Sequence, residues 1–165
     1  MSDESWYMIA VNVIYWLLKK APTKNKAKWI NQGKKQLSKS SMSVLFVDDE
    51  PFPIVKILKD QGWSNVKRIK DVVNLDIADI KNAEVIFIDI NGVAKKLFPT
   101  DEGLGLCHAL RLKYHDKYLV IYSAETKGER FHQGFSDANA RISKMAEPYE
   151  FINLLDNYLT KKNSE

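Results

Sequence analysis

Short apolar runs of strand length alternate with segments of helical periodicity over most of the chain, beginning at Ser43. The apolar runs are residues 44–47, 66–69, 85–90, 118–122 and 140–142. Residues 103–114 and a final segment with Phe151, Leu155 and Leu159 place apolar side chains at helical spacing. Strands that alternate with helices are typical of a parallel sheet with helices on both faces. We therefore predict a doubly wound α/β fold with five strands and about five helices.

The first 42 residues follow a different pattern. Residues 6–18 are apolar on every side of a helix except at Asn12, and eight lysines follow up to residue 39. Pro22 is expected to separate two helical pieces, and the serine-rich residues 38–43 are typical of a linker. The sequence thus divides into an apolar and basic helical segment with a linker (1–42), the α/β domain (43–160) and a short tail (161–165).

Three roles stay open for the amino-terminal segment. Its apolar helix, at about 1.5 Å per residue, spans about 20 Å, which is too short for a hydrocarbon core of about 30 Å. Asp3 and Glu4 stand where a secretory signal carries positive charge. The segment would lie on a membrane surface through residues 6–30, or pack on its own domain or on a partner protein, including a second copy. A basic arm that touches nucleic acid is the least favoured of the three.

The composition narrows the class of protein. With 165 residues, of which 45% are hydrophobic and 28% charged, the chain suits one ordinary domain with a short extension. The net charge of +4 is uneven, because residues 1–42 contain eight lysines and two acids, whereas residues 43–165 contain 17 basic and 19 acidic residues. The α/β domain therefore has no electrostatic support for nucleic-acid binding. Cys107 is the one cysteine, which excludes an intrachain disulfide and favours a cytoplasmic location, at the inner face of the membrane if the amino-terminal segment binds lipid.

Polar side chains stand at the ends of four predicted strands. Asp48 and Asp49 follow the first strand, Asp89 ends the third, Ser123 the fourth, and Lys144 follows the fifth. In an open parallel sheet the functional crevice lies beyond these carboxyl ends. Three converging carboxylates raise each other's pKa values unless a divalent cation lies between them, and Mg²⁺ prefers such oxygen ligands. A nearby hydroxyl and ammonium would bind phosphoryl oxygens, so the pattern indicates phosphoryl transfer.

Several linked segments resemble the receiver domains of two-component response regulators over about residues 43–159. They are residues 44–50 (VLFVDDE), 85–91 (VIFIDIN), 103–111 (GLGLCHALR) and 120–125 (VIYSAE), followed by Lys144. The resemblance implies the flavodoxin-like receiver fold. It also implies that the protein accepts a phosphoryl group from a phosphohistidine onto an aspartate, which by position is Asp89.

The same resemblance implies a metal site and its ligands. Asp49, Asp89 and the backbone carbonyl of Asn91 would bind Mg²⁺ directly, and Asp48 would lie in its water shell. Each of these residues occupies the matching place in the segments above. Mg²⁺ is therefore the one cofactor that the family assignment implies.

The remaining two positions complete the implied function. Ser123 takes the hydroxyl position that follows the phosphoryl group, and Lys144 takes the position of the family's lysine. We thus expect a single-domain response regulator that accepts its phosphoryl group from a histidine kinase or a histidine phosphotransfer protein and then changes its contacts with a downstream protein. Self-phosphorylation and slow autodephosphorylation at Asp89 are expected rather than conventional turnover.

Three features depart from the family pattern and leave alternatives open. The loop at residues 91–102 is longer than usual, Arg141 stands where the family often has an aromatic residue, and Met145 rather than proline follows the lysine. These changes suit a receiver-like adapter that binds a partner without phosphorylation. A hydrolase is the third interpretation, because residues 89–93 also resemble the nucleophile loop of haloacid-dehalogenase-like phosphatases. Asn91, where those enzymes have a second acid, disfavours it.

Overall fold

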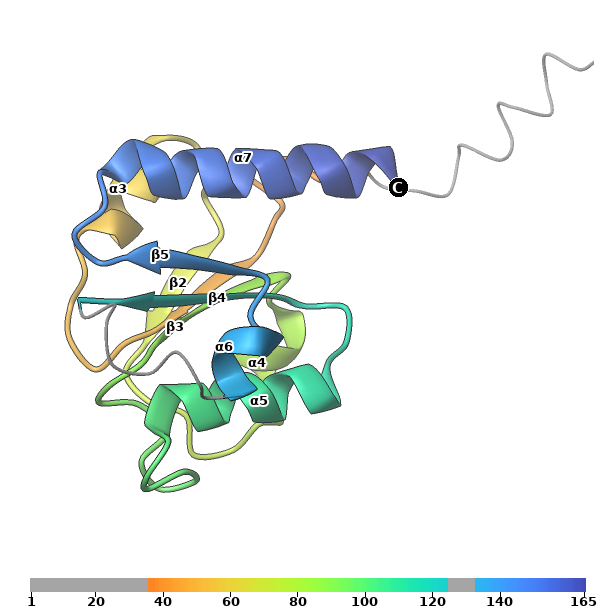
Figure 1. Ribbon diagram of the computed structural model, residues 1–165. Helices are drawn as coiled ribbons and strands as arrows, with labels where there is room; N and C mark the ends of the chain where they lie inside the picture. The colour runs from red at the N-terminus through yellow and green to blue at the C-terminus, as the bar shows by residue number, and fades with distance from the viewer. Residues whose placement is uncertain (1–35, 125–132) are drawn as a thin grey trace, which may run out of the picture. The chain divides into compact units, whose positions relative to one another are not determined.

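The computed structural model of the chain describes residues 36–124 and 133–165 (Figure 1). Leu37–Glu165 belongs to one compact unit. Residues 6–18, for which the sequence predicts an apolar helix, and most of the lysines of the amino-terminal segment lie outside the described residues, so their contact with lipid, protein or nucleic acid stays a prediction. Among the helices of the described part, none is both long and apolar enough to cross a bilayer.

Five parallel strands form one sheet in the order β2-β1-β3-β4-β5. The strands are β1 (Val44–Val47), β2 (Val66–Ile69), β3 (Val85–Asp89), β4 (Tyr118–Ser123) and β5 (Ala140–Ser143). The chain moves outward from β1 to β2 and then returns past β1 to β3, so the direction of winding reverses between β1 and β3. This arrangement confirms the predicted doubly wound sheet. It also places the expected crevice at the carboxyl ends of β1 and β3.

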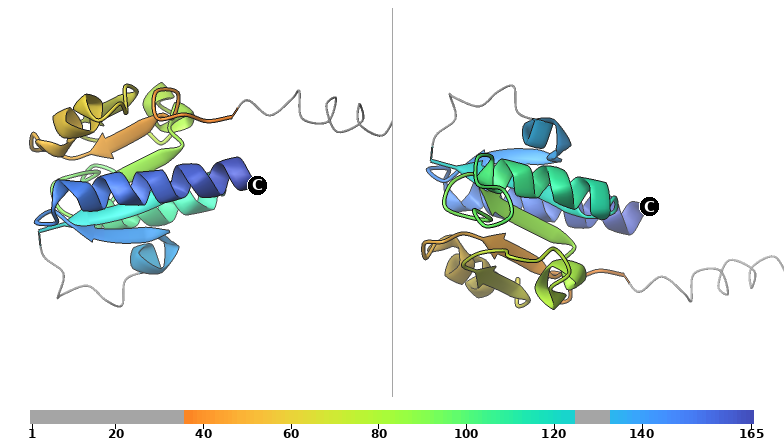
Figure 2. Two further views of the ribbon diagram at one scale, coloured as in Figure 1. Left: turned by 90° about the horizontal axis from the view of Figure 1, so that it is seen from above. Right: turned by 90° about the horizontal axis from the view of Figure 1, so that it is seen from below.

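Helices cover both faces of the sheet (Figures 1 and 2). One face carries α3 (Ile54–Asp60) and α7 (Pro148–Ser164), and the other carries α4 (Ala78–Asn82), α5 (Glu102–Lys113) and α6 (Gln133–Asp137). Because both faces are covered, β3 is buried at every position. This burial explains why its sequence is a continuous apolar run rather than an alternating one.

The two faces have different cores. On the face of α3 and α7, Phe46 and Phe87 stack with their ring centroids 4.4 Å apart, and Phe151 of α7 packs beside them. The opposite face is filled by aliphatic side chains of β1, β3, β4 and α5. Successive side chains of a strand point to opposite faces, so neighbouring residues at the end of β4 enter different surroundings. Tyr122 packs with the aromatic core, and Ser123 is on the other side.

The compact unit extends beyond residues 43–160 at both ends. α7 starts at Pro148, where a capping box between Glu147 and Glu150 stabilises its first turn. The helix continues to Ser164 and so includes most of the predicted tail. Residues before β1 also contact this unit: Leu37 exchanges two hydrogen bonds of 2.9 Å with Asn163 of α7, and Met42 is completely buried. The compact unit thus includes the described residues from Leu37 onward.

Candidate functional site

Three aspartates meet at the carboxyl edge of β1 and β3. Val47 pairs with Ile88, so Asp48, one residue further along, stands beside Asp89 at the end of β3. Asp48, Asp49 and Asp89 each offer one carboxylate oxygen within 4.8 Å of the other two. Asp48 is 1% exposed and Asp89 is 5% exposed, whereas Asp49 is half-buried. The sheet thus brings together the three carboxylates that the sequence places at strand ends.

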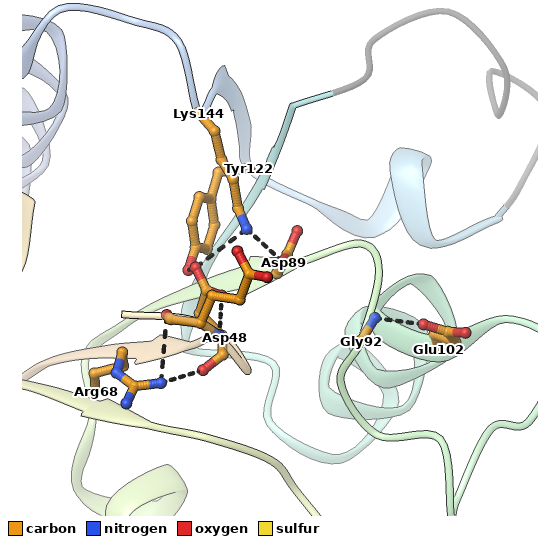
Figure 3. Close-up of polar contacts among 8 residues, drawn as sticks. Asp48, Arg68, Asp89, Gly92, Glu102, Tyr122 and Lys144 are labelled. Atoms are coloured by element: carbon orange, nitrogen blue, oxygen red, sulfur yellow. Dashed lines mark hydrogen bonds and ion pairs between the residues drawn. The ribbon is translucent and has the colours of Figure 1, made fainter. Parts of the chain in front are cut away.

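Asp48 is held by contacts with four other residues, most of which Figure 3 labels. Its Oδ1 accepts a 2.9 Å hydrogen bond from the backbone N–H of Glu50, and its Oδ2 accepts one of 2.7 Å from the Tyr122 hydroxyl of β4. The Lys144 ammonium lies 3.2 Å from the same Oδ2. Arg68 of β2 donates to the backbone carbonyl of Asp48 at 2.6 Å. These contacts fix both the carboxylate and the peptide to which it belongs.

Lys144 connects two of the carboxylates. Its backbone N–H donates to the carbonyl of Ser123 at 2.9 Å, which continues the pairing of β4 with β5 beyond the end of β5. Its side chain, 19% exposed, then reaches Asp89, where Nζ lies 2.5 Å from Oδ2. Figure 3 shows the ammonium between Asp89 and Asp48. Ser123 itself is buried at the end of β4, beside Tyr122, which pairs with Asp89.

The local charges explain the direction of two pKa shifts. Burial raises the pKa of Asp89, because removing a carboxylate from water costs more here than the Lys144 ammonium returns. Burial disfavours the ammonium of Lys144, but its contacts with Asp89 and Asp48 outweigh that effect and raise its pKa. One ammonium therefore only partly neutralises three carboxylates. A further positive charge between them would relieve the remaining repulsion.

The loop after β3 is shaped around Asp49. Gly92 has a φ of +86°, which favours glycine, and a Cβ at Gly92 would lie 2.4 Å from Oδ2 of Asp49 and displace that carboxylate. The backbone N–H of Gly92 donates to Oε2 of Glu102 at 2.5 Å. Among the described residues no peptide bond is cis, so the carbonyl of Asn91 points away from Glu102. The side chain of Asn91 is exposed.

Helix α5 packs against the strand end without a gap. A Cβ at Gly103 would lie 1.7 Å from the backbone carbonyl oxygen of Asp89. The first turn of α5 can therefore approach the end of β3 only with glycine at this place. The sequence marks this position only as the start of a helix.

The donor set fits a small, hard divalent cation. Carboxylate oxygens are the protein ligands that Mg²⁺ takes, and it uses few of them because it keeps several waters. The cluster contains oxygen ligands and neither histidine nor cysteine. The half-buried Asp49 leaves the cluster partly open to solvent, which such a cation needs.

Three contributors to the site are not apparent from the sequence alone. Tyr122 lies within an apolar strand and has the pattern of a core residue, Arg68 has the pattern of an exposed strand residue, and Glu102 that of a first-turn helix acid. Each acts on the site through a partner distant in the chain. Of the three, only Tyr122 could have been linked to the site from the sequence, because it is next to the last residue of a predicted strand.

Arg141, which departs from the family pattern, has a defined place. Its guanidinium lies 4.7 Å from the ring centroid of Phe135 in α6 and donates to the backbone carbonyl of Phe135 at 2.7 Å. The side chain is exposed and ties β5 to α6.

Comparison with known proteins identifies the fold. No protein-family model matches the sequence, and no curated protein does. A response regulator receiver domain protein (CheY-like) from Methanospirillum hungatei JF-1 matches with a TM-score of 0.60 at 19% identity, over 74% of this chain and 97% of that chain. The receiver domain of NtrX from Brucella abortus matches with a TM-score of 0.58 at 21% identity, over 72% and 98% of the two chains. For the Vibrio cholerae chemotaxis protein CheY4 the values are 0.54, 24%, 70% and 97%.

These structural neighbours are response regulator receiver domains. The match spans most of this chain and nearly all of theirs. Because the sequence identities are low, the structural likeness establishes the fold alone. The α/β domain thus has the flavodoxin-like receiver fold expected from its sequence.

Proposed function

We propose that this domain works as a response regulator receiver that takes a phosphoryl group on Asp89, with Mg²⁺ bound beside it. The observation that supports this most strongly is the cluster itself. Three carboxylates lie within 4.8 Å of one another, and Lys144 contacts Asp89 and Asp48, at the carboxyl edge of a receiver-fold sheet. A site with this charge and these ligands is suited to bind a cation and to stabilise a phosphoryl group.

The proposed donor is a phosphohistidine on a histidine kinase or a histidine phosphotransfer protein. One carboxylate oxygen of Asp89 attacks the phosphorus, so an O–P bond forms. The P–N bond breaks, and its electron pair leaves on the imidazole nitrogen, which takes a proton from water. Such a transfer needs in-line positioning and neutralisation of the phosphoryl oxygens more than a strong nucleophile. Burial at the end of β3 holds the Asp89 carboxylate in one place for this attack.

The residues around Asp89 divide the remaining work. Asp49, Asp89 and the carbonyl of Asn91 would hold Mg²⁺, with Asp48 bound to it through water. The metal would neutralise charge on the phosphoryl oxygens. Lys144 contacts Asp89 before the transfer. After it, the ammonium would donate a hydrogen bond to a phosphoryl oxygen.

The response to phosphorylation would pass through Ser123. Its hydroxyl would donate to another phosphoryl oxygen and draw the end of β4 inward. β4 pairs with β5 on its other side, so the movement would reach the surface formed by β5 and the neighbouring helices. A downstream protein that binds this surface would then distinguish the two states.

Incubation with acetyl phosphate and Mg²⁺ tests the proposal, with the phosphorylated fraction measured by intact-protein mass spectrometry. The wild type should gain one phosphoryl group, and Asp89→Asn should gain none. Asp60→Asn is the matched control, because Asp60 is an exposed aspartate at the end of α3. Absence of label on the wild type over a range of donor concentrations, or equal labelling of Asp89→Asn, would reject phosphorylation at this site.

A further inference from the structure

Tyr122 reaches the site in two ways: its hydroxyl contacts Asp48, and the Lys144 ammonium lies 5.2 Å from the centroid of its ring. Its side chain is completely buried on the aromatic face of β4. The ring packs against Phe46, Phe52 and Phe87, with centroid distances of 5.7, 5.5 and 6.1 Å. These neighbours fix the ring, and the hydroxyl projects past the end of β1 to Asp48 (Figure 3).

The chemistry of the contact sets its direction. Asp48 offers only acceptor oxygens when ionised, so the Tyr122 hydroxyl donates to Oδ2 over the 2.7 Å between them. A tyrosine phenol is protonated at neutral pH, so this hydroxyl has a proton to donate. A charge-assisted hydrogen bond of this kind is stronger than one between neutral groups.

Some partners of Asp48 are fixed by the fold, whereas Lys144 is shared with a second carboxylate. The hydroxyl of Tyr122 and the N–H of Glu50 contact Asp48 through groups that are fixed in the fold. Lys144 divides its ammonium between Asp48, at 3.2 Å, and Asp89, at 2.5 Å. When Lys144 follows a phosphoryl group on Asp89, Tyr122 is the side-chain donor that stays on Oδ2.

We propose that Tyr122 is a positioning residue for the metal site: its hydroxyl holds the Asp48 carboxylate in the orientation that Mg²⁺ binding requires, independently of where Lys144 is. This role rests on the proposed function. It assigns a task to an aromatic side chain that, by burial alone, belongs to the hydrophobic core. Residues that orient the groups around a metal commonly affect its affinity although they do not touch it.

The variant Tyr122→Phe isolates the hydroxyl, because it keeps the ring and its three aromatic neighbours. Mg²⁺ affinity, measured by isothermal titration calorimetry, should fall by about tenfold. Tyr118→Phe is the matched control: Tyr118 is on the same strand at the opposite end, where its ring packs on Tyr158 at 4.5 Å. That variant should bind Mg²⁺ as the wild type does. Similar losses in both variants, or an unchanged affinity for Tyr122→Phe, would overturn the proposal.

A double-mutant cycle tests whether the hydroxyl acts through Asp48. Asp48→Asn should weaken Mg²⁺ binding, and adding Tyr122→Phe to it should cause little further loss, because the two groups form one unit. A second, additive tenfold loss would show that the hydroxyl does not act through Asp48. Failure of the wild type to bind Mg²⁺ would overturn the proposed function together with this inference, whereas normal binding by both wild type and Tyr122→Phe would overturn the inference alone.

A measurement on the wild type covers the case in which Tyr122→Phe does not fold. The buried hydroxyl proton, hydrogen-bonded to a carboxylate, should give a slowly exchanging proton NMR signal that shifts when Mg²⁺ is added. A signal that is present and insensitive to Mg²⁺ would contradict a positioning role.

Discussion

Two lysines at opposite ends of the sheet show how the same side chain serves two different purposes. Lys117 immediately precedes β4, and Lys144 immediately follows β5. Lys117 is 6% exposed and donates to the backbone carbonyls of Lys81 and Ala83 at 2.9 and 2.8 Å. Lys144 instead contacts the carboxylates of the site. Burial is common to both, so the difference between them comes from their partners.

The balance between burial and charged partners shifts the two pKa values in opposite directions. Burial lowers the pKa of Lys117, because carbonyl dipoles satisfy the ammonium without repaying its lost hydration, and Asp116 and Glu84 offset this only in part. The carboxylates around Lys144 outweigh its burial and raise its pKa. Lys117 thus ties the chain after α4 to the start of β4, whereas Lys144 keeps its charge and can exchange one anionic partner for another.

The largest effect is expected from Lys144→Met, which keeps the length of the side chain and removes its charge. Phosphorylation of Asp89 by acetyl phosphate should slow by about a hundredfold, comparable to removing a preorganised donor from other sites of charge stabilisation. Mg²⁺ affinity should not weaken, because the variant removes a cation that competes for the same carboxylates. Initial rates and calorimetry measure the two quantities. Equal loss of phosphorylation and Mg²⁺ binding would contradict this division of roles.

Lys117→Met should affect stability instead. It leaves two backbone carbonyls without their donor, so the free energy of unfolding at neutral pH should fall by about 1–3 kcal/mol. The phosphorylation rate of the folded protein should be unchanged. Urea unfolding measures the loss, and Lys56→Met, at an exposed position of α3, is the control with an expected change within about 0.5 kcal/mol. A slower phosphorylation rate in Lys117→Met would contradict a purely structural role for Lys117.

Two glycines extend the same comparison. Gly92 at the site and Gly62 before β2 have φ values of +86° and +92°, so alanine at either place should cost about 1–2 kcal/mol of unfolding free energy. A Cβ at Gly62 has nothing within 4 Å, whereas one at Gly92 displaces the Asp49 carboxylate. Of the two variants, only Gly92→Ala should therefore weaken Mg²⁺ binding. Equal Mg²⁺ affinities for the two variants, measured by calorimetry, would show that Asp49 does not bind the metal.

The smallest effect is a dependence of stability on pH that comes from Lys117. Its pKa is lower in the folded protein than in the unfolded chain, so between the two values the unfolded chain binds more protons and stability rises with pH. The stability of the wild type relative to Lys117→Met should therefore increase as the pH rises from neutrality toward the ordinary pKa of lysine. Urea midpoints of both proteins across that range measure the difference. A decrease would mean that the carbonyls favour the charged form.

Much of the sheet follows from the sequence, because strand periodicity and burial are local properties. The runs at Val44–Val47 and Val66–Ile69 form strands with the expected bounds. The rule that parallel strands meet at their carboxyl ends then places Asp48, Asp89 and Lys144 at one edge without any knowledge of their contacts. The family resemblance, based on the same segments, implied the same fold.

Other features depend on contacts between residues that are far apart in the chain. The residues before β1 contact the folded unit at several distant positions: Leu37 meets Asn163, 126 positions away, Lys39 pairs with Asp156, and Met42 is completely buried. The boundary expected at residue 43 followed from local composition, which contains no information about those contacts.

The sequence by itself determined which polar groups stand at the strand ends, since strand pattern and residue type are both written along the chain. Only the tertiary structure decided which groups orient them. Tyr122 is 74 positions from Asp48, and its aromatic ring matches the pattern of a core residue whether or not its hydroxyl has a partner. Packing against three other aromatic rings directs that hydroxyl, and packing is a property of the assembled fold.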